Sequence, residues 1–445
     1  MQAAGLRACK PDGNKGLRPV GGSTQGAERG AGERQLLWGV SRSDLEIAQS
    51  GGIIRLMIKR DLEPRLKKAA KSFPAVTLTG PRQSGKSTLC QAVFADHPVA
   101  NLESPDVRAF ASEDPRAFLA QFPKGAIIDE VQRCPQILSY LQGMIDAERK
   151  PGRWILTGSQ NLALLESVSQ SLAGRTAVMQ LLPLVHGEVR RFKRHPRSLD
   201  EVIFSGSYPG VFDRKLDPKD WYASYVATYV ERDVRTVSNV GDLTSFQRFL
   251  GICAGRTAQM LNMSSLASDC GIAQPTVKAW LSVLETCFIA FRLPAFSGNI
   301  AKRLVKMPKL HFLDSGLVCW LLGIRSADEL RTHPLRGAVF ESWVVSEILK
   351  HRVNQGEHGH LFYYRDQHGI EADLIVEQGR KLTIVEAKAG QTVTGDMLKS
   401  ARRVQEILKP LRQTEAIVIH GGSAAQSRDE VKLVPWSTIG KLEWV

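Results

Sequence analysis

The sequence predicts an α/β fold in which helices cover both faces of a parallel sheet. Between residues 76 and 181, five short apolar runs have the length of buried strands, and stretches with helical periodicity separate them. Strands joined by helices pair in parallel, because each helix returns the chain to the same end of the sheet. The five predicted strands are Val76–Thr79, Val99–Leu102, Ala126–Asp129, Trp154–Thr157 and Ala177–Leu181.

A leader of different composition precedes this sheet. Residues 1–56 are rich in glycine and show no apolar periodicity, so they cannot bury enough surface to offset the entropy cost of ordering. We expect a disordered leader over 1–56 and a natural start of the chain at Met57, where a helical pattern begins. The sheet-forming domain is predicted for residues 57–190.

Two helical segments are predicted after the sheet. Residues 191–245 have the pattern of a helical lid or linker, and residues 246–335 that of a small helical domain. Within the second segment, Ser264–Ala267 begins one helix, Gly271 ends it and Gln274–Lys278 begins the next. This rhythm is typical of a helix-turn-helix.

The pattern changes again in the last segment, residues 336–445. A helix is predicted over Phe340–Lys350, and three strand-like runs follow around Tyr363, Leu374 and Ile384. Helices mixed with strands predict a second α/β domain at the end of the chain.

Composition predicts a cytoplasmic protein without membrane contact. The 445 residues contain no apolar run near the roughly 18–20 residues that a membrane span requires, and the N-terminus lacks the apolar core of a secretion signal. None of the seven cysteines forms a CxxC pair, so neither a disulfide framework nor a zinc site is indicated. The net charge of +14 attracts polyanions, and DNA is the expected partner.

A glycine-rich loop with the spacing G-x-x-x-x-G-K-[ST] lies between the first predicted strand and a predicted helix. Backbone N–H groups of such a loop wrap phosphates, Lys86 neutralises their charge, and the hydroxyl of Ser87 is a ligand for Mg²⁺. The helix dipole adds positive potential at the same point. We therefore expect ATP and Mg²⁺ as cofactors. The predicted contacts are Gly80, Pro81, Arg82, Gln83, Ser84, Gly85, Lys86, Ser87 and Thr88.

Two carboxylates stand at the end of the third predicted strand. Asp129 would complete the Mg²⁺ ligands together with Ser87, and Glu130 would polarise the attacking water as a catalytic residue. The alternative is that both carboxylates only solvate the end of a strand.

Further candidates flank the fourth and fifth predicted strands. Ser159, Gln160 or Asn161 could sense the γ-phosphate, and ordinary loop polarity explains these residues nearly as well. Arg175 is a candidate catalytic residue that stabilises transition-state charge, in cis or from a neighbouring subunit. A structural salt bridge is the alternative for Arg175, and the question of an oligomer stays open.

These motifs resemble a bacterial family of AAA-superfamily ATP-binding proteins whose C-terminal domain of unknown function is similar to restriction endonucleases. The likeness runs from about Met57 to Val445. It implies a P-loop ATPase core, a winged-helix-like middle and a nuclease-like α/β domain at the C-terminus. The segments that carry it are GPRQSGKST at 80–88, NLESPDVR at 101–108, IIDEVQRCP at 127–135, LTGSQN at 156–161, SLAGR at 171–175, GSYPG at 206–210, YVERDV at 229–234, FLDSGL at 312–317 and FES at 340–342.

The last domain carries charged residues in the pattern D…ExK. Glu386 and Lys388 alternate along a predicted strand and so point to one face, and Asp373 precedes the strand before it. Phosphodiester hydrolysis needs carboxylates that hold Mg²⁺ and a lysine that orients water, so Asp373 and Glu386 are predicted metal ligands. With Glu341 on the preceding helix, the predicted catalytic set is Glu341, Asp373, Glu386 and Lys388.

Two functions are compatible with these features. In the first, Mg²⁺-dependent ATP binding and hydrolysis control a DNA-directed, nuclease-like C-terminal domain. In the second, the chain is an ATP-switched regulator that binds DNA or protein and cuts nothing. Because no member of the C-terminal array is missing, the sequence favours the first.

Overall fold

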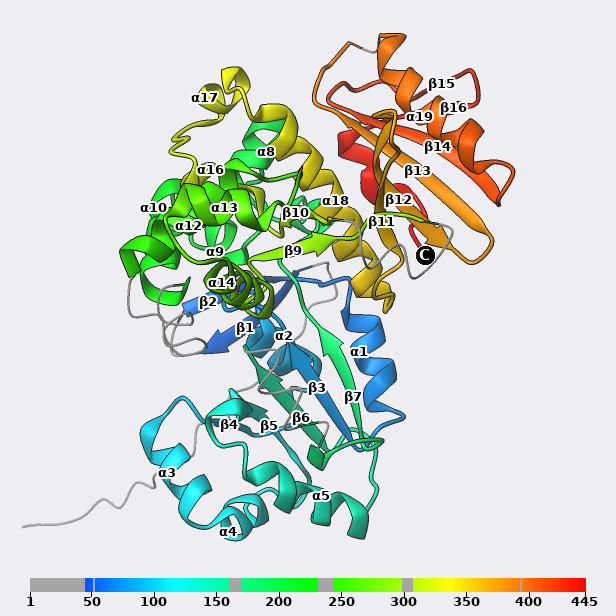
Figure 1. The fold of residues 1–445 in the computed structure, drawn as a ribbon. Coiled ribbons are helices and arrows are strands. Elements are labelled where there is room, and N and C mark those ends of the chain that lie inside the picture. The colour runs from blue at the N-terminus through cyan, green and yellow to red at the C-terminus, as the bar shows by residue number, and fades with distance from the viewer. Residues whose placement is uncertain are drawn as a thin grey trace, which may run out of the picture. The chain divides into compact units, whose positions relative to one another are not determined.

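In the computed structural model of the chain, the described residues are 45–50, 53–159, 168, 170–230, 243–297, 307–392 and 394–445. Every described residue belongs to one compact unit, which spans residues 40–445. Figure 1 shows the order of the elements along the chain, from the blue hairpin to the orange and red elements of the last domain.

The first described elements lie within the predicted leader. Strands β1 (Leu45–Ser50) and β2 (Ile53–Ile58) pair antiparallel along their whole length. The expectation of a disordered leader is therefore wrong for residues 45–50 and 53–56. Two six-residue runs separated by a Gly-Gly pair are a hairpin signal, and the glycine content of the segment as a whole obscured it. Residues 1–44 lie outside the described residues.

The predicted parallel sheet is confirmed, with five strands in the order β4-β5-β6-β3-β7 and every neighbouring pair parallel. Each predicted strand is present, with ends that differ by at most one residue. The strands are β3 (Ala75–Thr79), β4 (Val99–Asn101), β5 (Ala126–Asp129), β6 (Trp154–Gly158) and β7 (Thr176–Gln180).

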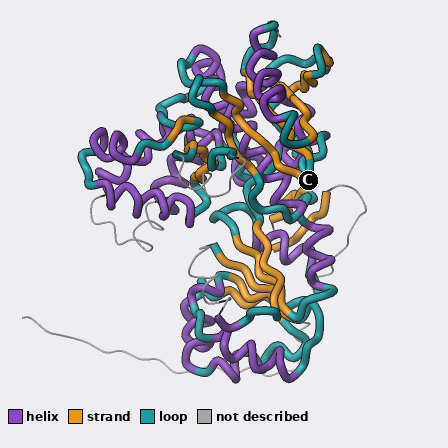
Figure 2. The backbone as a smooth tube through the Cα atoms, turned by 45° about the vertical axis from the view of Figure 1, so that its right-hand side comes forward, coloured by secondary structure: helices purple, strands orange, loops and turns teal. Residues whose placement is uncertain are grey.

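Helices cover this sheet on both faces, as Figures 1 and 2 show. Successive side chains of a strand point to opposite faces, so Ile128 of β5 packs with α4 and α5 while Ile127 packs with α1 and α2. These are two separate apolar cores, and they hold the carboxyl ends of the strands in fixed positions. The helices are α1 (Glu63–Ala70), α2 (Lys86–Val93), α3 (Pro105–Glu113), α4 (Pro115–Ala120) and α5 (Ile137–Ala147), with a 3₁₀ turn at Val131–Arg133.

Short helices follow the sheet, as the sequence predicts for the lid or linker. Tyr208, Trp221 and Tyr225 are buried against one another, and the last two rings stack 4.9 Å apart. The aromatic residues of this segment therefore belong to its core. Its elements are α7 (His186–Val189), α8 (Leu199–Ser205), α9 (Pro209–Asp213), α10 (Pro218–Tyr225) and a π-helical turn at Val226–Val230.

The middle segment contains the predicted pair of helices and a small sheet. Asn262 caps α13 by accepting a hydrogen bond from the Ser265 N–H, and Gly271, in the left-handed conformation, ends it before α14 begins. Strand β10 lies between β8 and β9 and is antiparallel to both. The elements are α12 (Leu243–Gly255), β8 (Gln259–Met260), α13 (Met263–Cys270), α14 (Gln274–Thr286), β9 (Ala290–Leu293), β10 (Lys309–Phe312), α16 (Ser315–Leu321) and α17 (Ala327–Thr332).

The last segment forms a six-stranded mixed sheet in the order β11-β12-β13-β14-β16-β15. The first three strands are antiparallel, whereas β13, β14 and β16 run parallel. Helices α18 and α19 pack against this sheet. The elements are α18 (Arg336–Gln355), β11 (Leu361–Arg365), β12 (Glu371–Gln378), β13 (Lys381–Lys388), α19 (Asp396–Leu408), β14 (Gln413–His420), β15 (Gln426–Arg428), β16 (Val431–Pro435) and a 3₁₀ segment at Trp436–Lys441.

Helix α18 is longer than the predicted Phe340–Lys350 by about one turn at each end. Buried charged residues, among them Glu347 and Lys350, make it a helix of the protein interior. Within the described ranges, no helix is both long enough and apolar enough to span a membrane.

Candidate nucleotide site and C-terminal acidic cluster

The phosphate-binding loop connects the end of β3 to the start of α2. Gly80 has φ +145°, and a Cβ at this position would lie 2.2 Å from the Leu181 carbonyl oxygen. Gly85 caps α2 in the left-handed region, with φ +92°. Both positions therefore require glycine, for close approach at the first and for backbone conformation at the second.

Lys86, the first residue of α2, is buried and turned into the loop. Its Nζ donates to the carbonyl oxygens of Gly80 at 2.9 Å and Pro81 at 2.8 Å. Burial lowers the pKa of Lys86 to about 8, and the nearby carboxylates of Glu130 and Asp129 act in the opposite direction. The ammonium thus lies in a confined place where phosphate oxygens would be favourable partners.

The residues present fit a bound nucleotide. The Ser84 hydroxyl of the loop is buried and has no hydrogen-bond partner among the described residues, which leaves it free for a ligand. Beside the loop lies a cavity of about 230 Å³, whose lining includes Gly85 and Thr88 of the loop and helix and the apolar side chains of Leu184 and Phe192. An apolar wall next to a phosphate loop suits a flat base.

Asp129 and Glu130 lie at the carboxyl end of β5, where the sequence predicts them. Thr157 of β6 donates a short hydrogen bond to Asp129 Oδ1. Glu130 has φ +56°, and its Oε2 accepts hydrogen bonds from Ser159 Oγ at 3.0 Å and from Gln132. Of the three proposed phosphate sensors, Ser159 therefore contacts the predicted base; Gln160 and Asn161 lie outside the described residues.

Arg175 lies at the opposite end of the sheet. Its carbonyl accepts a hydrogen bond from the N–H of Ala75, the first residue of β3, whereas the phosphate loop follows the last residue of that strand. The guanidinium binds Asp146 through two hydrogen bonds of 2.7 Å. Five residues of strand separate the two ends by about 16 Å, so a role of Arg175 in cis at this loop is wrong. A contribution from a neighbouring subunit stays a prediction.

Several residues around the loop carry no motif and were missed by sequence reasoning. The cavity beside the loop is also lined by Ile58 and Arg60, at and just after the end of β2, and by Arg214, which follows α9. Arg60 is buried, and its Nη1 donates to the Ser84 carbonyl at 2.7 Å. No spacing in the sequence links these residues to the loop, because tertiary contacts alone bring them there.

From Arg60, a chain of buried polar contacts leads away from the loop. Arg60 Nε donates to Glu188 Oε1 at 3.0 Å, and Glu188 Oε2 accepts from the Val185 N–H at 3.1 Å. The next backbone N–H, that of His186, donates to Glu347 Oε2 at 2.7 Å. We call this chain, Arg60–Glu188–Glu347–Lys350, the buried relay.

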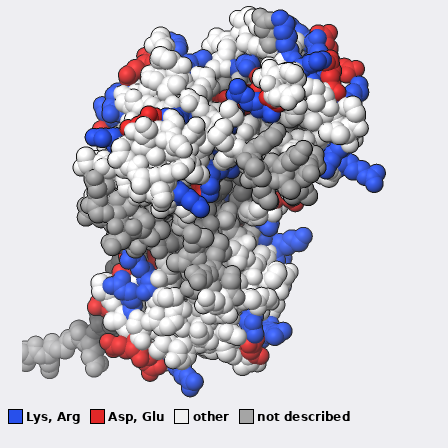
Figure 3. Space-filling view, in the orientation of Figure 1, with Lys and Arg blue, Asp and Glu red and all other residues white. Residues whose placement is uncertain are grey.

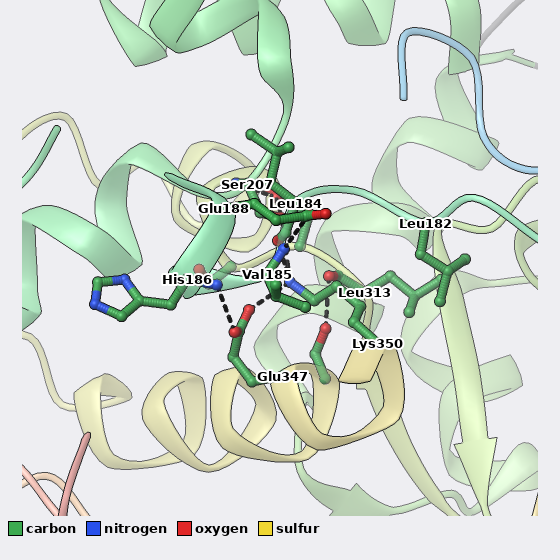
Figure 4. A network of polar contacts seen from close by, with 12 residues as sticks. Leu182, Leu184, Val185, His186, Glu188, Ser207, Leu313, Glu347 and Lys350 are labelled. Atoms are coloured by element: carbon green, nitrogen blue, oxygen red, sulfur yellow. Dashed lines mark hydrogen bonds and ion pairs between the residues drawn. The ribbon is translucent and has the colours of Figure 1, made fainter. Parts of the chain in front are cut away.

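Figure 4 shows the part of the buried relay that reaches α18. Lys350 Nζ donates to Glu347 Oε1 at 2.7 Å and to the Leu184 carbonyl at 3.0 Å. Burial alone would raise the pKa of Glu347, but Lys350 and the His186 N–H outweigh it and hold that pKa below its ordinary value. The hydrogen bonds to Leu184 and His186 therefore hold α18 against the segment that follows β7.

The four predicted residues of the C-terminal array come together. Lys388 Nζ donates to Glu386 Oε1 at 2.6 Å, and Asp373 Oδ2 accepts from the Ala387 N–H at 2.8 Å. Glu341 approaches them from α18, and both it and Asp373 contact one lysine ammonium. Strand alternation thus places Glu386 and Lys388 together as expected.

That ammonium belongs to Lys309, a residue that sequence reasoning missed. It comes from β10 in the middle segment, and its Nζ lies 2.8 Å from Glu341 Oε1 and 2.5 Å from Glu371 Oε1. The distance to Asp373 Oδ1 is 3.8 Å. Only tertiary packing relates Lys309 to these carboxylates, so no local signal in the sequence predicts it. We call Glu341, Glu371, Asp373, Glu386, Lys309 and Lys388 the acidic cluster.

Burial and mutual repulsion raise the pKa values of the cluster's carboxyl groups. Burial followed by the charge of Asp373 raises the pKa of Glu341 to about 8 and that of Glu386 to about 7. The pKa of Asp373 is raised as well, mainly by burial. The carboxylates outweigh burial at Lys309 and raise its pKa. In the part of the chain that is described, no three His, Cys, Asp or Glu side chains form a group suited to a metal ion.

Three family models match the chain in succession. Residues 72–190 match a model described as an AAA domain. Residues 196–328 and 336–439 match two domains of unknown function, DUF8612 and DUF4143. The first range contains the phosphate loop, and the last contains the carboxylates of the acidic cluster.

Among solved structures, a Walker-type ATPase of Pyrococcus abyssi is 14% identical, with a TM-score of 0.40, and the match covers 59% of this chain and 94% of that one. DnaA of Aquifex aeolicus, solved with bound AMPPCP, is 15% identical with a TM-score of 0.26, covering 50% and 85%. At these TM-scores the two structures add nothing to the assignment of function.

Curated relatives cover more of the chain. The uncharacterized protein Rv2008c of Mycobacterium tuberculosis is 30% identical over 383 residues, which are 85% of this chain and 84% of the relative. The uncharacterized protein Mb2031c of Mycobacterium bovis matches with the same values. The phosphate loop, its carboxylate partners and the AAA-domain match agree with one another, and the chain belongs to the family of these mycobacterial proteins, with an AAA-type ATP-binding domain at residues 72–190.

Proposed function

We propose that the chain binds Mg²⁺-ATP at the loop between β3 and α2 and hydrolyses it. The observation that carries this proposal is Lys86, whose buried ammonium holds two loop carbonyls beside Asp129 and Glu130. An ammonium in this place can exchange carbonyl oxygens for phosphate oxygens without moving far. Ser87 and Asp129 would hold the Mg²⁺ ion, which supplies charge neutralisation at the transferred phosphate.

Glu130 is the proposed catalytic base. Ser159 and Gln132 hold its carboxylate from one side, so the side chain is positioned before substrate arrives. Glu130 would orient a water for attack on the γ-phosphorus and take its proton as the bond to the β-phosphate breaks. Arg175 could stabilise this reaction only from a neighbouring subunit. A catalytic role of Arg175 therefore requires an oligomer.

We further propose that nucleotide state controls the C-terminal domain. The buried relay supports this, because it connects the Ser84 carbonyl of the phosphate loop to Glu347 and Lys350 on α18. The same helix bears Glu341 of the acidic cluster. A shift of the loop on binding phosphate would therefore act on the helix that supplies one carboxylate of the second site.

The proposed activity of the second site is Mg²⁺-dependent cleavage of DNA in a restriction-endonuclease-like domain at 336–445. Glu341, Asp373, Glu386 and Lys388 lie in one cluster, which supports this activity. Lys309 favours the alternative, an ATP-switched regulator that binds DNA or protein without cutting, because a lysine already neutralises the carboxylates.

DNA as the partner rests on charge and on the middle segment. The net charge is +14, and the helix pair α13–α14 would belong to a winged-helix-like domain. On the face drawn in Figure 3, the described Lys and Arg side chains occur in several separate groups, mixed with Asp and Glu. The proposal of a DNA partner therefore rests on the net charge and on the helix pair, and not on a concentrated basic patch on this face.

The decisive experiment measures ATP turnover and nicking of supercoiled DNA by the purified full chain in Mg²⁺, with and without ATP. Lys86→Ala should remove turnover together with any effect of ATP on nicking. Asp373→Ala should remove nicking and leave turnover intact. Nicking that survives in Asp373→Ala would have another source, such as a contaminating nuclease.

Absence of nicking under all conditions, with ATP turnover present, would replace the nuclease proposal by the regulator. Absence of turnover in the wild-type chain would overturn the first proposal itself. The two sites are therefore tested separately, since each variant removes one activity.

A further inference from the structure

The acidic cluster contains a buried cation of its own. Lys309 is only 3% exposed, and its ammonium contacts the carboxylates of Glu341, Glu371 and Asp373. The Tyr363 ring lies 5.7 Å from the same nitrogen, on the side of β11. A buried ammonium is costly unless several charged or polar partners surround it, and here they do.

Lys309 lies where carboxylate oxygens of the proposed C-terminal site meet. Carboxylate oxygens from α18 and β12 converge on its Nζ, and these are two of the elements that carry the predicted array. Oxygens grouped in this way are the ligands that Mg²⁺ and Mn²⁺ prefer. A lysine tethered at this point and a divalent ion cannot occupy it together.

The two lysines of the cluster would not balance four ionised carboxylates, and the raised pKa values of Glu341 and Glu386 mean that protons take up part of the difference. Four carboxylates (Glu341, Glu371, Asp373 and Glu386) face two ammonium groups, Lys309 and Lys388. Glu386 Oε2 is buried and has no hydrogen-bond partner among the described residues, although Glu386 as a whole is only 4% exposed. This buried oxygen would be a further ligand for a divalent ion if the ammonium of Lys309 were removed.

The strand that carries Lys309 is tied to the helix that carries Glu341. Ser346 Oγ of α18 donates to the Leu313 carbonyl at 2.7 Å, and the Phe312 N–H donates to Ser342 Oγ at 3.3 Å. These bonds lie just after the end of β10 and within it, so the lysine enters the cluster from a fixed support. The packing between the middle segment and α18 therefore determines the position of Lys309.

We propose that Lys309 is a tethered cation that occupies the divalent-ion position of the acidic cluster and excludes the ion from it. This inference rests on the proposed C-terminal site and assigns its regulation. Removing the ammonium opens the position, so that a divalent ion binds between Glu341, Asp373 and Glu386. In the chain without nucleotide and DNA, Lys309 stays in place and no such ion binds, so the proposed cleavage requires that Lys309 leave this position.

The test is a titration of the full chain with Mn²⁺ in the absence of nucleotide and DNA, with free Mn²⁺ followed by electron paramagnetic resonance. Lys309→Met should bind one more Mn²⁺ per chain than the wild type. Adding Asp373→Asn to Lys309→Met should remove that ion again. Lys381→Met, which removes an exposed lysine paired with Glu415 in the same domain, should behave like the wild type.

Equal Mn²⁺ stoichiometry in the wild type and Lys309→Met would overturn the proposal. If Lys309→Met folds only when Mn²⁺ is added, the proposal is supported, because the ion then replaces the lost ammonium. If it does not fold at all, the double variant Lys309→Met/Glu371→Gln replaces it, because the second substitution returns the net charge of the cluster to the wild-type value. If this double variant folds and binds no additional Mn²⁺, the proposal is contradicted. The titration measures neither ATP turnover nor DNA nicking. A negative result for the Lys309 proposal can therefore be told apart from a negative result for the proposed function.

Discussion

Lys86 is the residue on which nucleotide binding depends most directly. We expect Lys86→Ala to weaken ATP binding by roughly 10- to 100-fold, since a hydrogen bond to a charged group contributes about 1.5–3 kcal/mol. The variant also leaves the carbonyls of Gly80 and Pro81 without their present donor. Calorimetric titration with ATP measures the loss. Lys71→Ala, at an exposed position just beyond α1, is the matched control and should bind ATP like the wild type.

Glu130 allows a second prediction at the scale of one residue. Glu130→Gln keeps the shape of the side chain and removes the base, so ATP binding should persist while turnover falls about 100-fold or more. Steady-state phosphate release and nucleotide affinity separate the two effects. Wild-type turnover in this variant would remove Glu130 as the base, and loss of binding would point to a structural role through Ser159 and Gln132.

Residues that belong to a local motif could be predicted, and residues that reach a site through packing could not. Gly80, Lys86 and Asp129 stand where their spacing places them, because strand, loop and helix are consecutive in the chain. Lys309 lies far from its partners in sequence, and its role depends on how β10 packs on α18. Arg60 meets the loop through the same kind of contact. Neither has a periodic pattern that would reveal it.

Among secondary-structure elements, the strands of the first sheet were the most predictable. They are short and almost fully apolar, since both faces of a parallel sheet are covered. The hairpin β1–β2 was missed because the composition of the whole leader dominated the interpretation. The last domain was predicted as helix and three strands, whereas β14, β16 and α19 became visible only in the structure.

The contact between α18 and the segment after β7 leads to an element-scale prediction. Glu347 and Lys350 are almost fully buried, at 1% and 2% exposure, and pair at 2.7 Å. Lys350→Met leaves a buried carboxylate without its cation and should lower the free energy of unfolding by about 3–5 kcal/mol. Urea denaturation measures this change.

The double variant Glu347→Gln/Lys350→Met is the control for the lysine variant. It removes both charges, so it should lose less stability than Lys350→Met alone. If the double variant loses as much unfolding free energy as Lys350→Met and Glu347→Gln lose together, the two side chains do not interact energetically. The buried relay would then end at α7.

At the scale of the whole molecule, the main feature is that contacts cross the boundaries between the three matched ranges. The models for 72–190, 196–328 and 336–439 divide the chain, yet Lys309, Glu347 and Lys350 all make contacts across those divisions. Both the buried relay and the acidic cluster are therefore shared between segments. Sequence patterns describe each segment by itself, so the assembly that relates the sites could not be predicted from them.

The last prediction concerns the net charge of the molecule and its proposed partner. If the charge of +14 serves DNA, affinity should fall steeply with salt, because each phosphate contact releases bound counterions. Lys278 is exposed on α14, whereas Arg292 is held by Glu285 through bonds of 2.7 and 2.6 Å. Lys278→Ala should therefore reduce the slope of log affinity against log salt by about 1, and Arg292→Ala by less. Fluorescence anisotropy with a labelled duplex measures both slopes between roughly 50 and 200 mM salt, a range over which several phosphate contacts change affinity strongly. Wild-type affinity that does not change over this range would contradict a DNA partner, since the excess of basic residues would then have no phosphate to neutralise.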